Sequence, residues 1–504
     1  MKASLWKANL IVFVGSFCTM ALELVAARIL APYIGVSLYT WTSIIGVVLA
    51  GISLGNYLGG KLADRSPAQN TLGWLLFLAG IATLGVVLVA QVATGANLDL
   101  PLIPKIVFLT TVIFFLPCCL LGMVSPLVVK LTLQDIHQTG TTIGTIYAFS
   151  SLGSIAGTFA TGFVLISMIG TRSIVALVGI TLVIMALLLT KMGSTRVQAA
   201  VILVSLLALS WQISQRSALA STCTLETDYY CIKVTEEMTT DQRPMRKLVL
   251  DHLVHSFVIL DDPTHLEYGY EKVYAEMARL LAGPDRPLSA LFIGGGGYTF
   301  PRYLESQYPG STLDVVEIDP GVTRIAHTQL GLPDTTTIRS YNEDARQYLM
   351  RATPSAQYDL ILGDAFNDLS VPYHLTTQEF SERVRQFLKP DGLYLINAID
   401  SYSKGSFMKA FAYTLTQVFP YVYITAPGNG WEWTTSTFVL VASQQPLTSE
   451  RFAEAQRAAG VDPVTRFLPA AQQAEYLALN PVLLTDDYVP VDNMIAPLFV
   501  ERGF

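Results

Sequence analysis

The sequence predicts two unlike parts: a multi-span α-helical membrane domain, followed by an α/β domain with a small antiparallel β-sheet at its start. Of the 504 residues, 51% are hydrophobic and 14% charged, whereas an ordinary soluble domain has about 25% charged residues. Residues 1–215 hold ten Lys and Arg but four Asp and Glu, and 216–504 hold 22 basic and 35 acidic residues. Strands and helices alternate only in the acidic part. The predicted domains are therefore 1–215, 216–262 and 263–504.

The first part contains seven apolar stretches, each near the roughly 20 residues that cross a bilayer. They are 9–33, 41–60, 72–94, 106–129, 142–168, 173–190 and 198–214. The first stretch follows two lysines, as in a signal peptide, but it is too long for one and six more stretches follow. The sequence therefore predicts a multi-pass protein of the cell (inner) membrane.

Basic residues in the short loops predict the orientation. One side of the predicted bundle carries Lys2, Lys7, Lys61, Arg65, Lys130, Lys191 and Arg196, and the other carries mainly Lys105 and Arg172. The amino terminus is therefore expected in the cytoplasm. Seven spans then place the acidic part outside, but a seventh helix that lies along the membrane surface returns it to the cytoplasm. The sequence leaves both placements open.

Two charged residues, Glu23 and Arg28, fall within the first span. They either line a cavity for a polar substrate, or Glu23 pairs internally while Arg28 reaches the membrane surface. The segment 59–65 resembles the cytoplasmic loop motif of major facilitator transporters. The small residues of 153–162 predict close helix packing.

Five cysteines do not form a disulfide framework. Cys18, Cys118 and Cys119 lie in apolar stretches and are expected to be buried. Cys223 and Cys231 follow the last span and can pair across a hairpin, but the sequence does not decide whether they do.

The second part begins with three predicted antiparallel strands, at 229–235, 246–251 and 256–260. A helix is predicted over 268–282, ending at a Gly-Pro pair. Strands then alternate with helices, as in a parallel α/β sheet. These strands are predicted at 289–293, 313–319, 337–339, 358–362, 392–396, 422–425 and 437–442.

Glycines and carboxylates follow the predicted strands, at the edge where ligands bind in open parallel sheets. Gly294, Gly295, Gly296 and Gly297 follow the strand 289–293, and Glu317 stands at the end of the next one. Such an acid can accept both hydroxyls of a ribose, and Asp344 after the third strand can accept from an adenine amino group. The pattern indicates an adenosine-type ligand. The sequence shows no metal-ligand spacing, and its acidic part argues against binding nucleic acid.

At these positions the chain resembles the spermidine synthase (polyamine aminopropyltransferase) family, specifically a branch fused to a membrane domain. The matching motifs are Leu250-Asp251 with His255, Tyr270-Glu271, the glycine turn, Glu317, Asp344-Ala345 and the run from Asp364 to Leu375. The resemblance covers about residues 222–445 and implies a Rossmann-like fold of the class I methyltransferase type.

The resemblance also implies a role for each matching residue. Gly294 to Gly297, Glu317, Asp344 and Ala345 would hold decarboxylated S-adenosylmethionine, or S-adenosylmethionine itself. Asp364 would take the proton from an attacking amine. The substrate side would comprise His255, Tyr270, Glu271, Asn367, Asp368 and Tyr373. The expected partners are a small amine, the sulfonium ligand and the lipid bilayer, with a homo-oligomer left open.

Two departures from the family pattern keep other functions open. Gly297 stands where the family has an acid after its glycines, and Asn367 replaces the acid three residues after Asp364. Aminopropyl transfer to an amine is the leading hypothesis. The alternatives are methyl transfer or lyase cleavage on the same fold, and a transporter or sensor that only binds a polyamine or nucleoside.

Overall fold

A computed structural model describes residues 5–65, 69–95, 100–133, 139–189, 196–215, 219, 221–239, 241–283, 285–365, 370–428, 431 and 436–501. The chain divides into two compact units, Met1–Cys231 and Ile232–Phe504.

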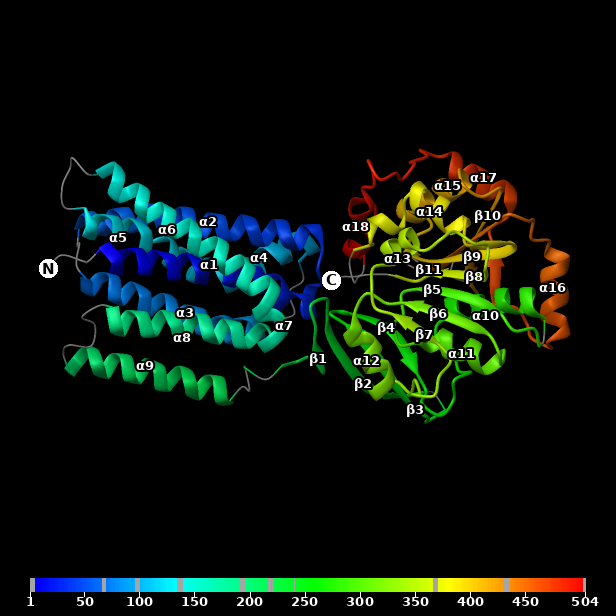
Figure 1. Ribbon diagram of the computed structural model, residues 1–504, viewed down its shortest axis with the longest axis horizontal. Helices are drawn as coiled ribbons and strands as arrows, with labels where there is room; N and C mark the ends of the chain where they lie inside the picture. Colours follow the sequence, from blue (N-terminus) through cyan, green and yellow to red (C-terminus); the bar gives the residue numbers. More distant parts are fainter. Residues whose placement is uncertain are drawn as a thin grey trace. The chain divides into compact units, whose positions relative to one another are not determined.

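The first unit is a bundle of long apolar helices (Figure 1). They are α1 (Leu5–Ile34), α2 (Leu38–Arg65), α3 (Gln69–Gly95), α4 (Leu102–Gly122), α5 (Val124–Thr132), α6 (Thr139–Ala160), α7 (Ile166–Ile169), α8 (Thr171–Leu189) and α9 (Arg196–Gln215), with a π-helical turn at Thr161–Leu165. Seven helices of the described chain are long and apolar enough to cross a membrane, when α4–α5 and α6–α7 each count as one. Helices therefore form at all seven predicted stretches.

Close packing joins α1 to α6, α2 to α4 and α3 to α8. A Cβ atom built on Gly153 of α6 would lie 2.1 Å from the carbonyl oxygen of Phe13 in α1. A Cβ atom on Gly55 of α2 would lie 2.2 Å from the carbonyl oxygen of Cys119. Only glycine allows the helices to approach so closely, which confirms the packing predicted for 153–162.

Among the described residues, Arg28 forms no salt bridge with Glu23. Its guanidinium donates to the carbonyl oxygen of Thr227 at 2.7 Å, and also to that of Asp228. Nearby in the sequence, Glu226 of β1 (Leu225–Glu226) accepts from the backbone N–H of Thr171 at 3.0 Å. These contacts fasten the segment after α9 to the helical unit.

Cys223 and Cys231 form a disulfide, with their Cα atoms 5.2 Å apart. The bridge closes a loop within the same fastened segment. Cys18, Cys118 and Cys119 are free and buried, as the apolar character of their surroundings predicts.

The second unit begins with an antiparallel sheet formed by β2 (Cys231–Met238), β3 (Pro244–Leu250) and β4 (Leu253–Val258). The helix α10 (Gly269–Ala282) follows, within one residue of its predicted start. Its apolar face, including Val273, Tyr274 and Met277, is buried in the core of this unit.

The main sheet has eight strands in the order β12-β10-β11-β9-β8-β5-β6-β7. Their bounds are β5 (Ser289–Ile293), β6 (Thr312–Val316), β7 (Arg339–Tyr341), β8 (Tyr358–Gly363), β9 (Leu388–Asp400), β10 (Tyr421–Pro427), β11 (Ser436–Ser443) and β12 (Thr465–Phe467). Strands β5 to β9 are parallel, whereas β10, β11 and β12 pair antiparallel. The sheet is therefore mixed, which corrects the expectation of a parallel sheet.

Helices cover both faces of this sheet. They are α11 (Thr299–Gln307), α12 (Pro320–Gln329), α13 (Ala345–Arg351), α14 (Gln378–Arg385), α15 (Phe407–Thr416), α16 (Ser449–Ala458), α17 (Ala470–Ala478) and α18 (Val491–Glu501), with a 3-10 turn at Tyr373–Leu375. Both α10 and α15 pack on β9, β10 and β11, and Figure 1 shows them on opposite sides of the sheet. In the sheet, β5 has β6 on one side and β8 on the other, so the strand order reverses at β5. A crevice is expected at this reversal of strand order.

Candidate active site

The glycine turn joins β5 to α11 at the reversal of strand order. Gly294 has a φ of 99°, and a Cβ atom there would lie 2.5 Å from the carbonyl oxygen of Asp364. The backbone N–H of Asp364 donates to the carbonyl oxygen of Ile293 at 2.9 Å. Glycine is therefore required at 294 by both conformation and space. The close approach brings the turn and Asp364 to one point.

Glu317 follows β6, and its carboxylate binds backbone N–H groups of and near the glycine turn. One carboxylate oxygen accepts from the N–H of Gly295 at 2.7 Å, and the other accepts from the N–H of Asp319 at 2.9 Å. Burial raises the pKa of Glu317, although these N–H groups favour the charged form. The N–H of Gly296 also donates to this carboxylate. A carboxylate has about four acceptor positions, so about one remains for a ligand hydroxyl.

Asp364 follows β8, and it is half-buried at the wall of a cavity. The side-chain amide of Asn397 in β9 donates to it at 2.7 Å, and the hydroxyl of Tyr270 also donates to it. Burial raises the pKa of Asp364, and these two hydrogen bonds oppose that rise. These two donors hold the Asp364 carboxylate in a fixed orientation, in which it can accept a proton.

A cavity of about 300 Å³ brings most of the predicted residues together. Its lining includes Gly294, Gly295, Gly296, Gly297, His255, Tyr270, Glu271 and Asp364. The lining also includes Ser256, Tyr268, Tyr274 and Asn397, which the sequence analysis missed. For Asn397 a signal was present, because it is a polar residue at the end of an apolar strand. The cavity is large enough for a small organic ligand.

Six predicted residues lie outside this lining or outside the described chain. Glu317 contacts the backbone of the glycine turn instead of lining the cavity. Asp344 caps α13 by accepting from the N–H of Gln347 at 2.9 Å, and its second oxygen lies 2.7 Å from a ring nitrogen of His374. Ala345 begins α13 and is buried. Tyr373 is exposed.

Asn367 and Asp368 belong to a segment, 366–369, that lies outside the described residues. Their predicted roles on the substrate side therefore stay predictions.

His255 faces the cavity from β4, with its Nε2 atom buried and without a hydrogen-bond partner. Burial lowers the pKa of His255 to about 4. The imidazole is therefore neutral at physiological pH, and it offers a ligand one hydrogen-bond donor and one acceptor. Within the part of the chain that the structure describes, no group of His, Cys, Asp and Glu is arranged to hold a metal ion.

Glu271 is buried beside Asp364, and one of its oxygens has no hydrogen-bond partner. Burial, and then the negative charge of Asp364, raise the pKa of Glu271 from 4.5 to about 8. Two neighbouring buried carboxylates are costly when both are ionised. At neutral pH the protein therefore keeps Glu271 protonated next to an ionised Asp364.

The wild-type protein is expected to lose thermal stability at alkaline pH, when Glu271 ionises. Replacing Glu271 with Gln should prevent this loss. Because the folded state binds this proton more tightly than the unfolded chain, the stabilisation is complete below pH 4.5 and is lost as the pH rises through about 8. Glu271→Gln stays uncharged, so its Tm at pH 8 should exceed that of the wild type by about 5 °C. Thermal unfolding of the purified protein across this pH range measures it. Asp285→Asn, at an exposed carboxylate after α10, should leave the pH dependence unchanged.

Gly297 leaves no room for the acidic side chain that the resembling family places there. A Cβ atom on Gly297 would lie 2.0 Å from the hydroxyl oxygen of Ser256 and 3.3 Å from Val258. The Ser256 hydroxyl occupies this space, and it has no hydrogen-bond partner. The absence of an acid at position 297 therefore goes together with a serine on β4. The hydroxyl of that serine lies near the place where the family's carboxylate would be.

We expect Gly297→Ala to destabilise the second unit by about 1–3 kcal/mol, because overpacking at a buried site costs this much. The double variant Gly297→Ala/Ser256→Gly removes the clashing atoms and should recover most of the lost stability. Unfolding curves of the wild type and the variants test this. Equal losses in the single and double variants would contradict the steric explanation.

The fold and the cavity define the second unit as a Rossmann-like domain of the class I methyltransferase type with a mixed sheet. The polyamine aminopropyltransferase of Vibrio vulnificus is 38% identical over 141 residues, which make up 28% of this chain and 47% of that protein. The resemblance to spermidine synthase-like proteins is thereby confirmed.

Other comparisons give a more distant likeness. The eEF1A lysine and N-terminal methyltransferase of Homo sapiens is 26% identical over 179 residues, covering 32% of this chain and 25% of that protein. This chain thus spans about half or less of the curated relatives that it matches. The crystal structure of a probable spermidine synthase from Corynebacterium glutamicum matches with a TM-score of 0.44 and 22% identity, over 51% of this chain and 95% of that one. No protein-family model matches the chain.

Proposed function

We propose that this protein is a membrane-bound aminopropyltransferase, which moves an aminopropyl group from decarboxylated S-adenosylmethionine to an amine. One observation carries the proposal: the half-buried carboxylate of Asp364 lines the same cavity as the glycine turn Gly294–Gly297. The similarity to polyamine aminopropyltransferases supports it.

In this reaction the nitrogen lone pair of a neutral amine attacks the carbon next to the sulfonium sulfur. The carbon–sulfur bond breaks, its electron pair stays on sulfur, and methylthioadenosine leaves without needing an acid. The enzyme must therefore deprotonate the ammonium group and hold both partners in line. Asp364 accepts that proton, and Tyr270, which donates to the same carboxylate, orients the amine beside it.

The adenosine part of the donor would lie against the glycine turn, with its ribose hydroxyls on Glu317. In the structure Glu317 already holds Gly295, so ribose binding and the shape of the turn depend on one side chain. Asp344 and Ala345 would contact the adenine. The Asp344 oxygen next to His374 would have to share that contact with the ligand.

Incubation of the purified full-length protein with decarboxylated S-adenosylmethionine and putrescine tests the proposal. Mass spectrometry should find methylthioadenosine together with a lengthened polyamine. Neither product is expected when Asp364 is replaced with Asn. Absence of both products with the wild-type protein would contradict the proposed reaction.

Methyl transfer or lyase cleavage of S-adenosylmethionine is the second candidate function. The similarity to a lysine and N-terminal methyltransferase favours it, as does the lack of room for an acid at Gly297. S-Adenosylhomocysteine with a methylated product would identify methyl transfer. Methylthioadenosine without a lengthened acceptor would identify a lyase. Binding without any turnover would instead support a sensor or transporter.

The seven apolar helices support a place in the membrane. With the amino terminus in the cytoplasm, an odd number of spans would place the second unit outside the cytoplasm. The disulfide between Cys223 and Cys231 supports this side, since such bonds persist in oxidising compartments. In intact cells, an impermeant maleimide should label Glu454→Cys on exposed α16. It should label Arg65→Cys, at the end of α2, only after permeabilisation. The reverse pattern would place the second unit in the cytoplasm.

A further inference from the structure

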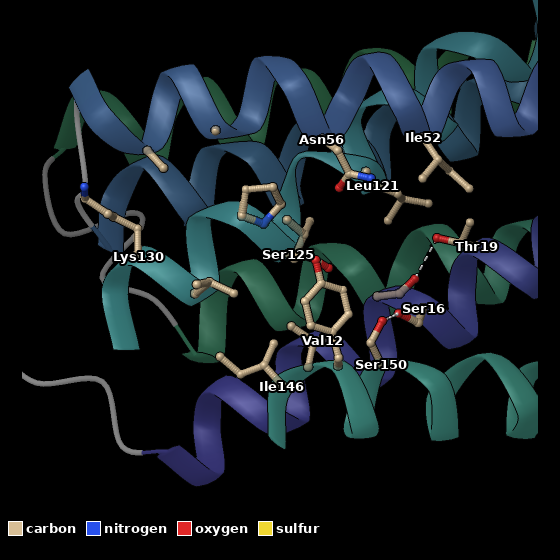
Figure 2. A pocket seen from close by; sticks show the side chains of 18 of the residues that line it. Val12, Ser16, Thr19, Ile52, Asn56, Leu121, Ser125, Lys130, Ile146 and Ser150 are labelled. Carbon is tan, nitrogen blue, oxygen red and sulfur yellow. Dashed lines mark hydrogen bonds between the residues drawn. The ribbon is translucent and has the colours of Figure 1, made fainter. Parts of the chain in front are cut away.

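The helical unit contains a cavity of about 480 Å³, which the proposed reaction does not use. It lies among α1, α2, α5 and α6, as Figure 2 shows. At one end of the unit it reaches Asp64 and Lys130, near the ends of α2 and α5. Its volume is typical of sites for small molecules.

Polar side chains from four helices face this cavity. Ser16 of α1 and Ser150 of α6 share a hydrogen bond of 2.7 Å. The amide of Asn56 and the hydroxyls of Ser125 and Tyr147 also line the cavity, and they have no hydrogen-bond partner among the described residues. Unpaired polar groups are costly within a bilayer. These three groups are therefore expected to bind water or a polar ligand.

The lining carries no net charge among the residues that the structure describes. Its charged side chains are Asp64 and Lys130, and they form an ion pair with each other at 2.9 Å. A polyamine brings several positive charges, and each would have to leave water without a free carboxylate to receive it. The cavity is therefore unsuited to a polyamine and suited to an uncharged polar molecule.

We propose that this cavity is a binding site for an uncharged nucleoside. The amide of Asn56 presents a donor and an acceptor side by side, which match the edge of an adenine. The ring of Tyr147 can stack on a base, and the hydroxyls of Ser125 and Ser16 can bind a ribose. Methylthioadenosine, an uncharged nucleoside, is chosen as the main probe because the proposed reaction would release it. This choice rests on the proposed function. Adenosine is the second probe, and its use does not depend on that function.

The first measurement asks whether the cavity is open to water. Ser125→Cys, in the full-length protein in lipid nanodiscs, should react with a charged methanethiosulfonate reagent. The free cysteines of the wild type are buried, so the wild type gives the background. Leu116→Cys, on the exposed surface of α4, should stay unreactive because that surface faces lipid. Asn56→Cys repeats the measurement from another helix.

The second measurement asks what occupies the cavity. Methylthioadenosine and adenosine should slow the labelling of Ser125→Cys, and spermidine should not. In Asn56→Leu/Ser125→Cys the nucleoside concentration needed for protection should rise about tenfold, as expected for the loss of one bound polar contact. Leu54→Ala/Ser125→Cys, altered at an exposed leucine of the same helix, should behave like Ser125→Cys.

Failure of both cysteines to react would show a dry cavity and overturn the proposal. Protection by spermidine alone, or protection that Asn56→Leu leaves unchanged, would overturn it as well. Labelling needs no turnover, so these results are independent of whether the second unit transfers an aminopropyl group.

Discussion

Asp364→Asn is expected to lower kcat for methylthioadenosine formation by about 10³-fold, within the range that a positioned general base contributes. The substitution keeps the shape of the side chain, and it removes the group that accepts the proton of the amine. Binding of the donor should change little, because the glycine turn contacts Asp364 through its backbone. Steady-state rates with decarboxylated S-adenosylmethionine and putrescine measure the effect.

The pH profile gives this prediction a second readout. The base must be ionised, and burial raises the pKa of Asp364, so kcat/KM of the wild type should rise with pH through a value above that of an ordinary aspartate. Asp364→Asn should lose this rise. Asp359→Asn is the matched control, because Asp359 lies on the same strand and pairs with Arg286 at 3.1 Å and Lys389 at 2.9 Å. Its loss should cost stability and leave the pH profile intact. Near-normal turnover by Asp364→Asn would show that another group is the base.

The fold of the second unit was largely predictable because its buried strands are short apolar runs that end in glycine or acid. The strand predicted over 289–293 is observed as Ser289–Ile293, and that over 358–362 as Tyr358–Gly363. Strand direction was predicted wrongly for β11, which runs antiparallel to both of its neighbours, β9 and β10. The segment between Pro427 and Ser436 is shorter than the dozen or more residues that a parallel crossover needs, so the sequence did contain the signal.

The candidate site was predictable where it depends on strand ends, and less so where it depends on packing across the fold. The glycine turn and Asp364 each follow the carboxyl end of a parallel strand, so the pattern of strand ends placed them at one edge of the sheet, although β6 and β7 lie between β5 and β8 in the sequence. Ser256 lies 41 residues before Gly297, and only the folded structure shows that its hydroxyl occupies the space beside that glycine. The cap and the contact with His374 at Asp344 also depend on side-chain positions that no spacing reveals.

Glu317→Gln is expected to raise the KM for the sulfonium donor by about 10- to 100-fold, because a lost or unsatisfied buried hydrogen bond costs about 1–3 kcal/mol. The carboxylate uses one oxygen for the N–H of Gly295 and the other for the N–H of Asp319. The carboxamide of Gln has only one acceptor oxygen. The N–H of either Gly295 or Asp319 would then face the NH₂ group of Gln, which is a donor. The glycine turn would loosen, and the ribose would lose an acceptor. The value of kcat should fall less, since Asp364 is unchanged.

Glu305→Gln separates this effect from general destabilisation. Glu305 also holds backbone and hydroxyl groups, accepting from the N–H of Thr337 at 2.6 Å and the hydroxyl of Thr336 at 2.9 Å, but it does not line the cavity. Its replacement should lower Tm and leave the donor KM unchanged. If both variants raised KM alike, Glu317 would act only through the stability of the domain. If neither did, the donor would not bind at the glycine turn, and the adenosine assignment would be wrong.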